Sequence, residues 1–145
     1  MEIYSIGFTQ KSAREFFGAL KAHRIERLLD VRLNNTSQLA GFAKQADLAY
    51  FLHEICNASY EHEPLLAPTQ EILDAYKKRK GDWDVYESAF VALMRSRSVE
   101  SVIDKESFKQ KTVLLCSEPT AGHCHRRLVL EYLQLHWQDV TILHL

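Results

Sequence analysis

Short apolar runs with the composition of β-strands alternate along the chain with longer segments of helical spacing. The apolar runs are bounded by polar residues, glycine or proline, and they are too short to form helices. We therefore predict five strands. They lie at residues 2–8, 25–32, 58–62, 111–116 and 139–145.

Between the strands, apolar residues recur every three or four positions, as they do on the buried face of a helix. The first helix is predicted at residues 13–20, with Thr9 as its N-terminal cap. A longer helical stretch, residues 68–107, is interrupted at Gly81 and is predicted to be an insert that covers or closes a cleft. The other predicted helices are residues 46–56 and 124–136.

The alternation of strands and helices favours an α/β fold, because a helix joins each strand to a parallel neighbour by a right-handed crossover. We predict a single domain over residues 1–145, with a parallel or mostly parallel sheet of about five strands flanked by helices. A chain of 145 residues buries about two-thirds of its unfolded surface and needs no metal or disulfide to hold a core. The composition, 46% hydrophobic and 26% charged, is that of a globular protein.

The formal net charge of −1 provides no long-range attraction to nucleic acid or anionic lipid. Residues 1–10 lack the basic start and apolar run of a signal peptide, and no apolar stretch approaches the roughly 20 residues of a membrane span. Three cysteines without the spacing of a disulfide framework fit a reducing compartment. We expect a cytoplasmic protein with no membrane partner.

Polar side chains follow several of the predicted strands. In an open parallel sheet, the loops that leave the C-terminal strand ends meet in a crevice, where helix N-termini favour anions. We predict that the turns after the second and fourth strands open into a shared pocket. The residues predicted to bind substrate there are Thr9, Asp30, Arg32, His62, Ser117 and Arg126.

The segment VLLCSEPTAGHCHR, residues 113–126, holds the densest set of reactive side chains. Cys124 begins the last predicted helix, and a thiol at a helix N-terminus can have a lowered pKa and a reactive thiolate. Glu118 follows a buried strand, where an unpaired carboxylate is costly, so it is a candidate acid or base. Arg126 has the charged, planar group that suits phosphate or carboxylate. The predicted catalytic residues are Cys116, Glu118, Cys124 and His125.

Structural interpretations compete with these assignments. Cysteine often serves as a small buried hydrophobic residue. We interpret Cys56 in this way, and the same interpretation is an alternative for Cys116 and Cys124. Asp30 and Arg32 also fit a structural ion pair with each other. Glu118 also fits a structural ion pair with Arg32 or Arg126. The basic run at residues 77–80 is typical of a solvated helix end, with a nucleic-acid patch as the alternative.

Zinc-ligand residue types occur together at Cys116, His123, Cys124 and His125. Three adjacent residues, however, are not expected to bend onto one ion, and the chain has no paired Cys-x-x-Cys knuckle. We therefore expect no metal and no other cofactor.

Four stretches match the motifs of a known protein family: SIGFT at residues 5–9, LLDVR at 28–32, SYEHEPLL at 59–66 and VLLCSEPTAGHCHR at 113–126. Through them the chain resembles, over essentially its full length, the family called domain of unknown function 488. The resemblance implies an α/β fold that brings the four stretches together, and it implies no established activity.

The chain departs from the family in two loops. After Arg32 it reads LNNTSQLAGF, where family members carry prolines flanking the serine. After Leu66 it has Ala67 and Pro68 in place of a glycine pair. If those glycines let the backbone approach a ligand, their absence implies altered specificity or a degenerate site.

Three functions fit these residues. The first is a hydrolase or transferase acting on a nucleotide, nucleoside or nucleic-acid base, with Arg32 and Arg126 holding an anion and Glu118 serving as acid, base or electrostatic stabiliser. The second is a rhodanese-like thiol enzyme, although nine residues separate Cys116 from Arg126 and Pro119 interrupts the loop. The third is a non-catalytic module that binds a nucleotide or anion. The expected partner is a small anionic ligand or nucleotide, with nucleic acid as a further candidate.

Overall fold

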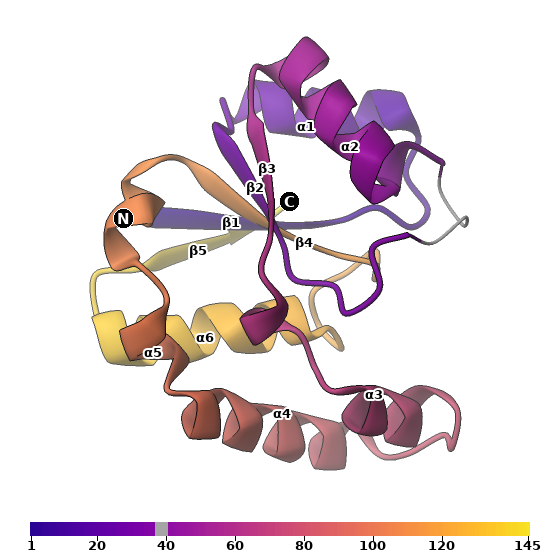
Figure 1. The fold of residues 1–145 in the computed structure, drawn as a ribbon, viewed down its shortest axis with the longest axis vertical. Coiled ribbons are helices and arrows are strands. Elements are labelled where there is room, and N and C mark those ends of the chain that lie inside the picture. The colour runs from indigo at the N-terminus through magenta and orange to yellow at the C-terminus, as the bar shows by residue number, and fades with distance from the viewer. Residues whose placement is uncertain (37–40) are drawn as a thin grey trace.

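The computed structural model describes residues 1–36 and 41–145 and confirms the predicted α/β fold. Five strands of the described chain pair in parallel in one sheet, in the order β3-β2-β4-β1-β5 (Figure 1). Residues 37–40, within the loop LNNTSQLAGF, lie outside the described part. The strands are β1 Glu2–Gly7, β2 Arg27–Asp30, β3 Ser59–His62, β4 Thr112–Cys116 and β5 Thr141–His144.

Ser12 and not Thr9 caps the N-terminus of helix α1, so the predicted cap is wrong. The Ser12 hydroxyl accepts from the backbone N–H of Glu15, and the Glu15 carboxylate accepts from the N–H of Ser12. This capping box satisfies two free N–H groups at once, which a lone threonine does not. The helices are α1 Ala13–Ala22, α2 Gln45–Phe51, α3 Gln70–Lys77, α4 Trp83–Arg97, α5 Val99–Val102 and α6 His125–Trp137.

Short helical turns occupy four further segments. The predicted helix at residues 46–56 ends in the turn Leu52–Cys56. The predicted insert at residues 68–107 contains α3, α4 and α5 and reaches into the turn Lys105–Lys109. No helix in the described parts of the chain has the length and apolar character needed to cross a membrane. The turns are η1 Gly41–Ala43, η2 Leu52–Cys56, η3 Pro64–Leu66 and η4 Lys105–Lys109.

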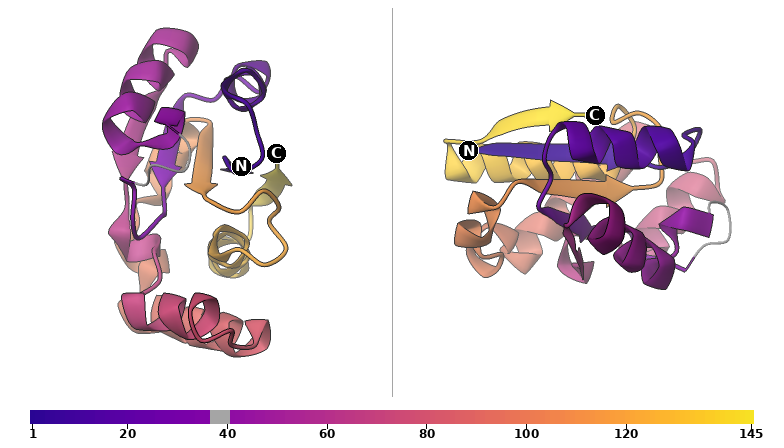
Figure 2. Two further views of the ribbon diagram at one scale, coloured as in Figure 1. Left: turned by 90° about the vertical axis from the view of Figure 1, so that its right-hand side faces the viewer. Right: turned by 90° about the horizontal axis from the view of Figure 1, so that it is seen from above.

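Helices cover both faces of the sheet, and each face has its own core. Helices α1 and α2 lie on one side of the strands; α6 lies on the other, with α4 packed on its outer side (Figure 1; Figure 2). In β4, Val113 and Leu115 join the core beneath α1, whereas Leu114 and Cys116 join the core beneath α6. This alternation follows the two-residue period of a strand, and burial on both faces is typical of parallel sheets.

The register of the sheet brings the C-terminal ends of the inner strands to one edge. Gly7 of β1 lies opposite Cys116 of β4, and Asp30 of β2 lies opposite Leu115. His62 of β3 lies opposite Asp30. The turns that follow these strands therefore leave the sheet side by side, at the edge where α/β proteins bind ligands.

Candidate functional site

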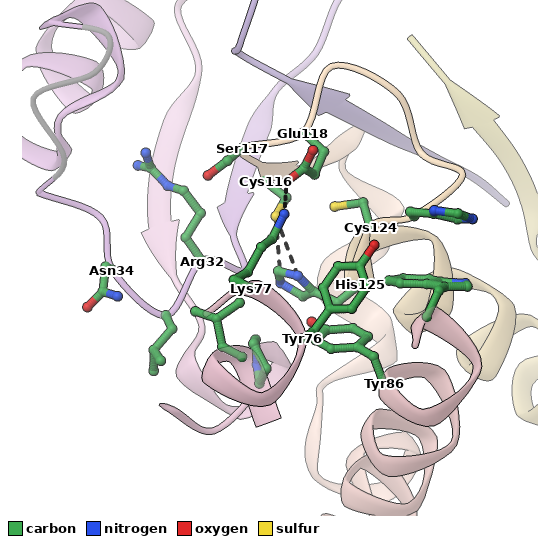
Figure 3. Close-up of a pocket in the computed structure, with 15 residues that line it drawn as sticks. Arg32, Asn34, Tyr76, Lys77, Tyr86, Cys116, Ser117, Glu118, Cys124 and His125 are labelled. Atoms are coloured by element: carbon green, nitrogen blue, oxygen red, sulfur yellow. Dashed lines mark hydrogen bonds and ion pairs between the residues drawn. The ribbon is translucent and has the colours of Figure 1, made fainter. Parts of the chain in front are cut away.

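A pocket of about 240 Å³ opens at the C-terminal ends of β2 and β4 (Figure 3). The turns after these strands form one side together with the N-terminus of α6, and α3 and α4 form the opposite side. The two turns thus share a pocket, as the sequence pattern predicts. The lining residues are Arg32, Leu33, Asn34, Pro68, Leu73, Tyr76, Lys77, Trp83, Tyr86, Cys116, Ser117, Glu118, His123, Cys124 and His125.

The thiol of Cys116, the last residue of β4, faces His125, the first residue of α6. The sulfur lies 3.4 Å from Nδ1 of His125. The other ring nitrogen, Nε2, lies 2.6 Å from the carbonyl oxygen of Val31. Because a carbonyl only accepts hydrogen bonds, Nε2 carries the proton and, in a neutral ring, Nδ1 presents its lone pair to the sulfur.

Cys124, at the N-terminal cap of α6, completes a cluster with Cys116 and His125. Both sulfurs and a ring nitrogen lie within 4.8 Å of one another, and all three residues are buried. Figure 3 shows the two sulfurs facing one another. The hydrogen bond with Cys124 lowers the pKa of the Cys116 thiol against the opposing effect of burial, aided by two backbone N–H groups and the charge of Arg126. The same hydrogen bond, together with burial, raises the pKa of Cys124.

Of the adjacent residues 123–125, two converge on Cys116 and the third does not, in line with the expectation that all three would not bend onto one ion. Cys124 has an extended backbone (φ −138°, ψ 138°) and precedes the first helical residue, so the helix does not set the angle between its side chain and that of His125. Both side chains therefore reach Cys116. The ring of His123 lies apart from them, stacked on Trp83.

Glu118 enters the pocket from the turn after β4 and forms an ion pair with Lys77 of α3. Burial lowers the pKa of Lys77, but the hydrogen bond and charge of Glu118 raise it, and the net shift is upward. Among the described residues, Glu118 forms no ion pair with Arg32 or Arg126. Its partner, Lys77, belongs to the basic run at residues 77–80, which the sequence pattern predicts to be a solvated helix end.

Three rings from α3 and α4 form the opposite side of the pocket and are joined by the ring of His123 from the turn before α6; we call Tyr76, Trp83, Tyr86 and His123 the aromatic wall. The Trp83 ring stacks on His123 with 4.9 Å between centroids and 17° between planes. It stacks on Tyr86 with 5.0 Å and 19°. The ring of Tyr76 is tilted against Tyr86 at 5.2 Å. The wall offers a flat, largely apolar surface to the pocket.

Arg32 lines the pocket from the loop after β2, where buried partners hold its guanidinium. Nε and Nη2 donate to the two carboxylate oxygens of Asp30 at 2.9 and 2.8 Å, and Nη2 also donates to the carbonyl of Ala43. Asp30 accepts a further hydrogen bond from the Tyr60 hydroxyl. Nε2 of His62 donates to the Arg32 carbonyl. Nη1 of Arg32 is buried and has no hydrogen-bond partner among the described residues.

Arg126 is fully buried behind the turn after β4, outside the pocket. Its Nη1 donates to the carbonyl of Glu118 at 2.7 Å, and its Nε donates to the hydroxyl of Ser5 at 3.2 Å. Gly7 permits the turn to come this close, because a Cβ at this position would lie 1.6 Å from the carbonyl oxygen of Glu118. The arginine therefore holds the shape of the turn.

The predicted site residues divide into two groups. Asp30 and His62 hold Arg32, Arg126 holds the turn after β4, and Thr9 donates its hydroxyl and N–H to the carbonyl of Ser117. Because Arg126 lies behind the turn, it does not face a ligand together with Arg32, in contrast to the expected anion clamp. The residues that line the pocket are Arg32, Cys116, Ser117, Glu118, Cys124 and His125.

Residue spacing alone does not predict that the aromatic wall, Lys77 or Asn34 belongs to the site. Tyr86 has helical spacing, which is typical of core residues, and it is indeed buried. One signal was present in the chain: Tyr76, Lys77 and Trp83 lie close together in the insert that is predicted to cover a cleft.

A family model with the description Domain of unknown function DUF488 matches residues 12–133 of the chain. The match includes β2, β4 and the first part of α6, which form the polar side of the pocket. No curated protein and no solved structure matches the chain.

Proposed function

The chain belongs to the DUF488 family, and from the geometry of its pocket we propose that it is an enzyme that acts on the base of a nucleotide, nucleoside or nucleic acid. One observation carries the proposal: the reactive turn with Cys116 and Glu118 lies across a small pocket from the aromatic wall. The proposal includes a cytoplasmic location, which suits the three free thiols of the described chain.

The size and lining of the pocket favour a single flat ring system. Small-molecule sites usually have volumes of about 300–1,000 Å³. The pocket, at about 240 Å³, lies just below this range and suits a base better than a dinucleotide. The aromatic wall lines the pocket with rings against which a base can pack, and such packing is sequence-tolerant because every base has a π-face.

Polar groups opposite the wall supply recognition and chemistry. Arg32 lines the pocket, and its buried Nη1 lacks a partner among the described residues; a small shift of the side chain would let it donate to a ligand oxygen. Glu118 is half exposed and faces the pocket, so it is within reach of a bound ring as general acid or base. Lys77 pairs with this carboxylate and helps to hold it in the pocket.

The experiment is a panel of bases, nucleosides, mononucleotides and short single-stranded oligonucleotides, with binding followed by calorimetry and conversion by mass spectrometry. We expect Glu118→Gln to reduce turnover about 10²- to 10⁴-fold with little change in Kd, because it removes the proton-transfer group and keeps the shape. Trp83→Ala is expected to weaken binding about 5- to 150-fold through the loss of stacking.

Glu131→Gln and Tyr50→Ala are matched controls, since both residues lie on the surface away from the pocket and should leave both readouts unchanged. Full turnover in Glu118→Gln with loss in Cys116→Ser would favour the thiol enzyme. Binding without conversion of any compound would favour the non-catalytic module. If no compound in the panel binds, the proposal is wrong.

A further inference from the structure

We propose that Cys116, Cys124 and His125 bind a zinc ion at the base of the pocket. This inference goes beyond the proposed function and does not depend on it. It replaces the expectation, drawn from the sequence alone, that the chain holds no metal, because the structure brings the donor atoms together where residue spacing did not suggest it.

The separations of the donor atoms fit a tetrahedral zinc site. Zinc binds cysteine sulfur at about 2.3 Å and histidine nitrogen at about 2.0–2.1 Å, so a tetrahedral angle separates the two donors by roughly 3.6 Å. The Cys116 sulfur and Nδ1 of His125 are 3.4 Å apart. The full set of three donors lies within 4.8 Å, so a small movement of the Cys124 side chain suffices to close the site.

The ring of His125 is already oriented as a metal ligand. A zinc-bound histidine almost always donates its second ring N–H to a carboxylate or backbone carbonyl, which fixes the tautomer that leaves the first nitrogen free. Nε2 of His125 makes this bond to the carbonyl of Val31 at 2.6 Å. This hydrogen bond is a separate observation from the proximity of the three donor atoms, and it also indicates that Nδ1 of His125 binds the metal.

The chemistry of the donors selects the metal. Two thiolates and an imidazole are soft to intermediate ligands, which suit zinc, whereas magnesium and calcium require oxygen ligands. Two thiolate charges also balance the charge of a divalent ion, and this makes burial of the ion feasible.

Three protein ligands leave one coordination position open. Structural zinc sites usually have four protein ligands, whereas catalytic sites have three and keep the fourth position for water or substrate. Cys116, Cys124 and His125 all line the pocket, so the open position faces the space between Glu118 and the aromatic wall. A zinc ion here would therefore contact whatever occupies the pocket.

The first test uses the wild-type full chain and no organic ligand. After treatment with a chelator and a reductant, the protein is dialysed against zinc chloride and its bound metal is measured by mass spectrometry. We expect one zinc per chain, a higher Tm with zinc, and, after cobalt substitution, the thiolate-to-cobalt charge-transfer and visible bands of a tetrahedral site. Retention of no zinc, or a cobalt spectrum without thiolate bands, would overturn the proposal.

The second test maps the site. Cys116→Ser, Cys124→Ser and His125→Asn should each lower zinc affinity more than about 100-fold, beyond the 10- to 100-fold effect of losing a second-sphere partner. Cys56→Ser and His123→Asn are matched controls, because Cys56 lies on the other side of the sheet and His123 stacks on Trp83.

Circular dichroism verifies that each variant is folded; should the site variants fail to fold, the stoichiometry and cobalt spectrum of the wild type still decide. Equal loss in the controls, or none in the folded site variants, would also overturn the proposal. Zinc binding is measured without any base or nucleotide, so its failure is distinct from a failure of the proposed function.

Discussion

The two sides of the pocket are built in different ways. The turn after β4 rests on backbone packing and buried hydrogen bonds: Arg126 and Ser5 are fully buried, and Gly7 lies directly beneath the turn. The opposite side is formed by α3 and α4. Helix α3 has no buried residue, and its Lys77 side chain is 48% exposed.

The turn that carries Cys116 and Glu118 is therefore held more firmly than the side of the pocket that faces it. Buried hydrogen bonds and tight packing leave few alternative arrangements, so the turn holds Cys116 and Glu118 in one geometry. Stacked rings and a half-exposed ion pair are weaker restraints, and regions with few buried contacts open at low free energy. We expect α3, with Tyr76 and Lys77, to adjust to a ligand while the turn stays in place. Paired substitutions on the two sides sharpen this contrast.

The largest effect is expected from Gly7→Ala. The added Cβ would lie 1.6 Å from the carbonyl oxygen of Glu118, a backbone atom that cannot move without displacing the whole turn. Overpacking typically costs about 1–3 kcal/mol of the free energy of unfolding and occasionally more, and a clash with a fixed backbone atom belongs at the upper end of this range. Gly18→Ala in α1 is the control: it meets no atom within 4 Å and should stabilise the protein by up to about 1 kcal/mol. Urea denaturation measures both, and equal stability of the two variants would contradict the tight packing at the turn.

A smaller loss is expected from Arg126→Met, which keeps the length of the side chain and removes its donors. The carbonyl of Glu118 and the hydroxyl of Ser5 lose a buried partner, at a cost of about 1–3 kcal/mol. Ligand binding should weaken as well, although the residue does not line the pocket. Arg95→Met is the control: Arg95 is exposed on α4 and does not line the pocket, so its replacement should change the free energy of unfolding by less than about 0.5 kcal/mol. If the variants at 126 and 95 behave alike in denaturation and binding, the support role of Arg126 is wrong.

The smallest change in stability is expected on the insert side, from Lys77→Ala. Its ion pair with Glu118 is half exposed, so its loss costs under about 1 kcal/mol. Turnover should nevertheless fall, because the ion pair holds the Glu118 carboxylate in the pocket. Lys78→Ala is the matched control, since Lys78 pairs with Asp74 instead. Turnover is measured for both variants and should fall in Lys77→Ala alone; equal turnover would remove Lys77 from the site.

The sequence pattern predicts the sheet and the polar side of the pocket well. Runs such as TVLLC in β4 are too apolar and too short to be anything other than buried strands, and the ends of parallel strands must share an edge. The positions of Arg32, Cys116 and Glu118 follow from this rule.

Other features depend on tertiary contacts that periodicity does not reveal. Tyr86 has the same spacing whether its ring meets only the core or also a pocket, so the aromatic wall is not predicted. The sequence predicts that Arg126 binds a ligand, but its partner is the backbone carbonyl of Glu118. The residue pattern does not indicate which backbone carbonyls accept hydrogen bonds from side chains. The convergence of Cys124 and His125 depends on the extended backbone before α6.

The position of β4 in the sheet has a consequence for biosynthesis. β1 and β2 are consecutive along the chain, yet they do not pair; β4 lies between them and joins the two halves of the sheet. A nascent chain that has emerged only as far as α5 lacks this joining strand, and pairings between segments so distant in sequence form slowly. We expect cooperative folding to wait until β4 has left the ribosome, so that the inner strands of the sheet and the position of Cys116 form in a single event.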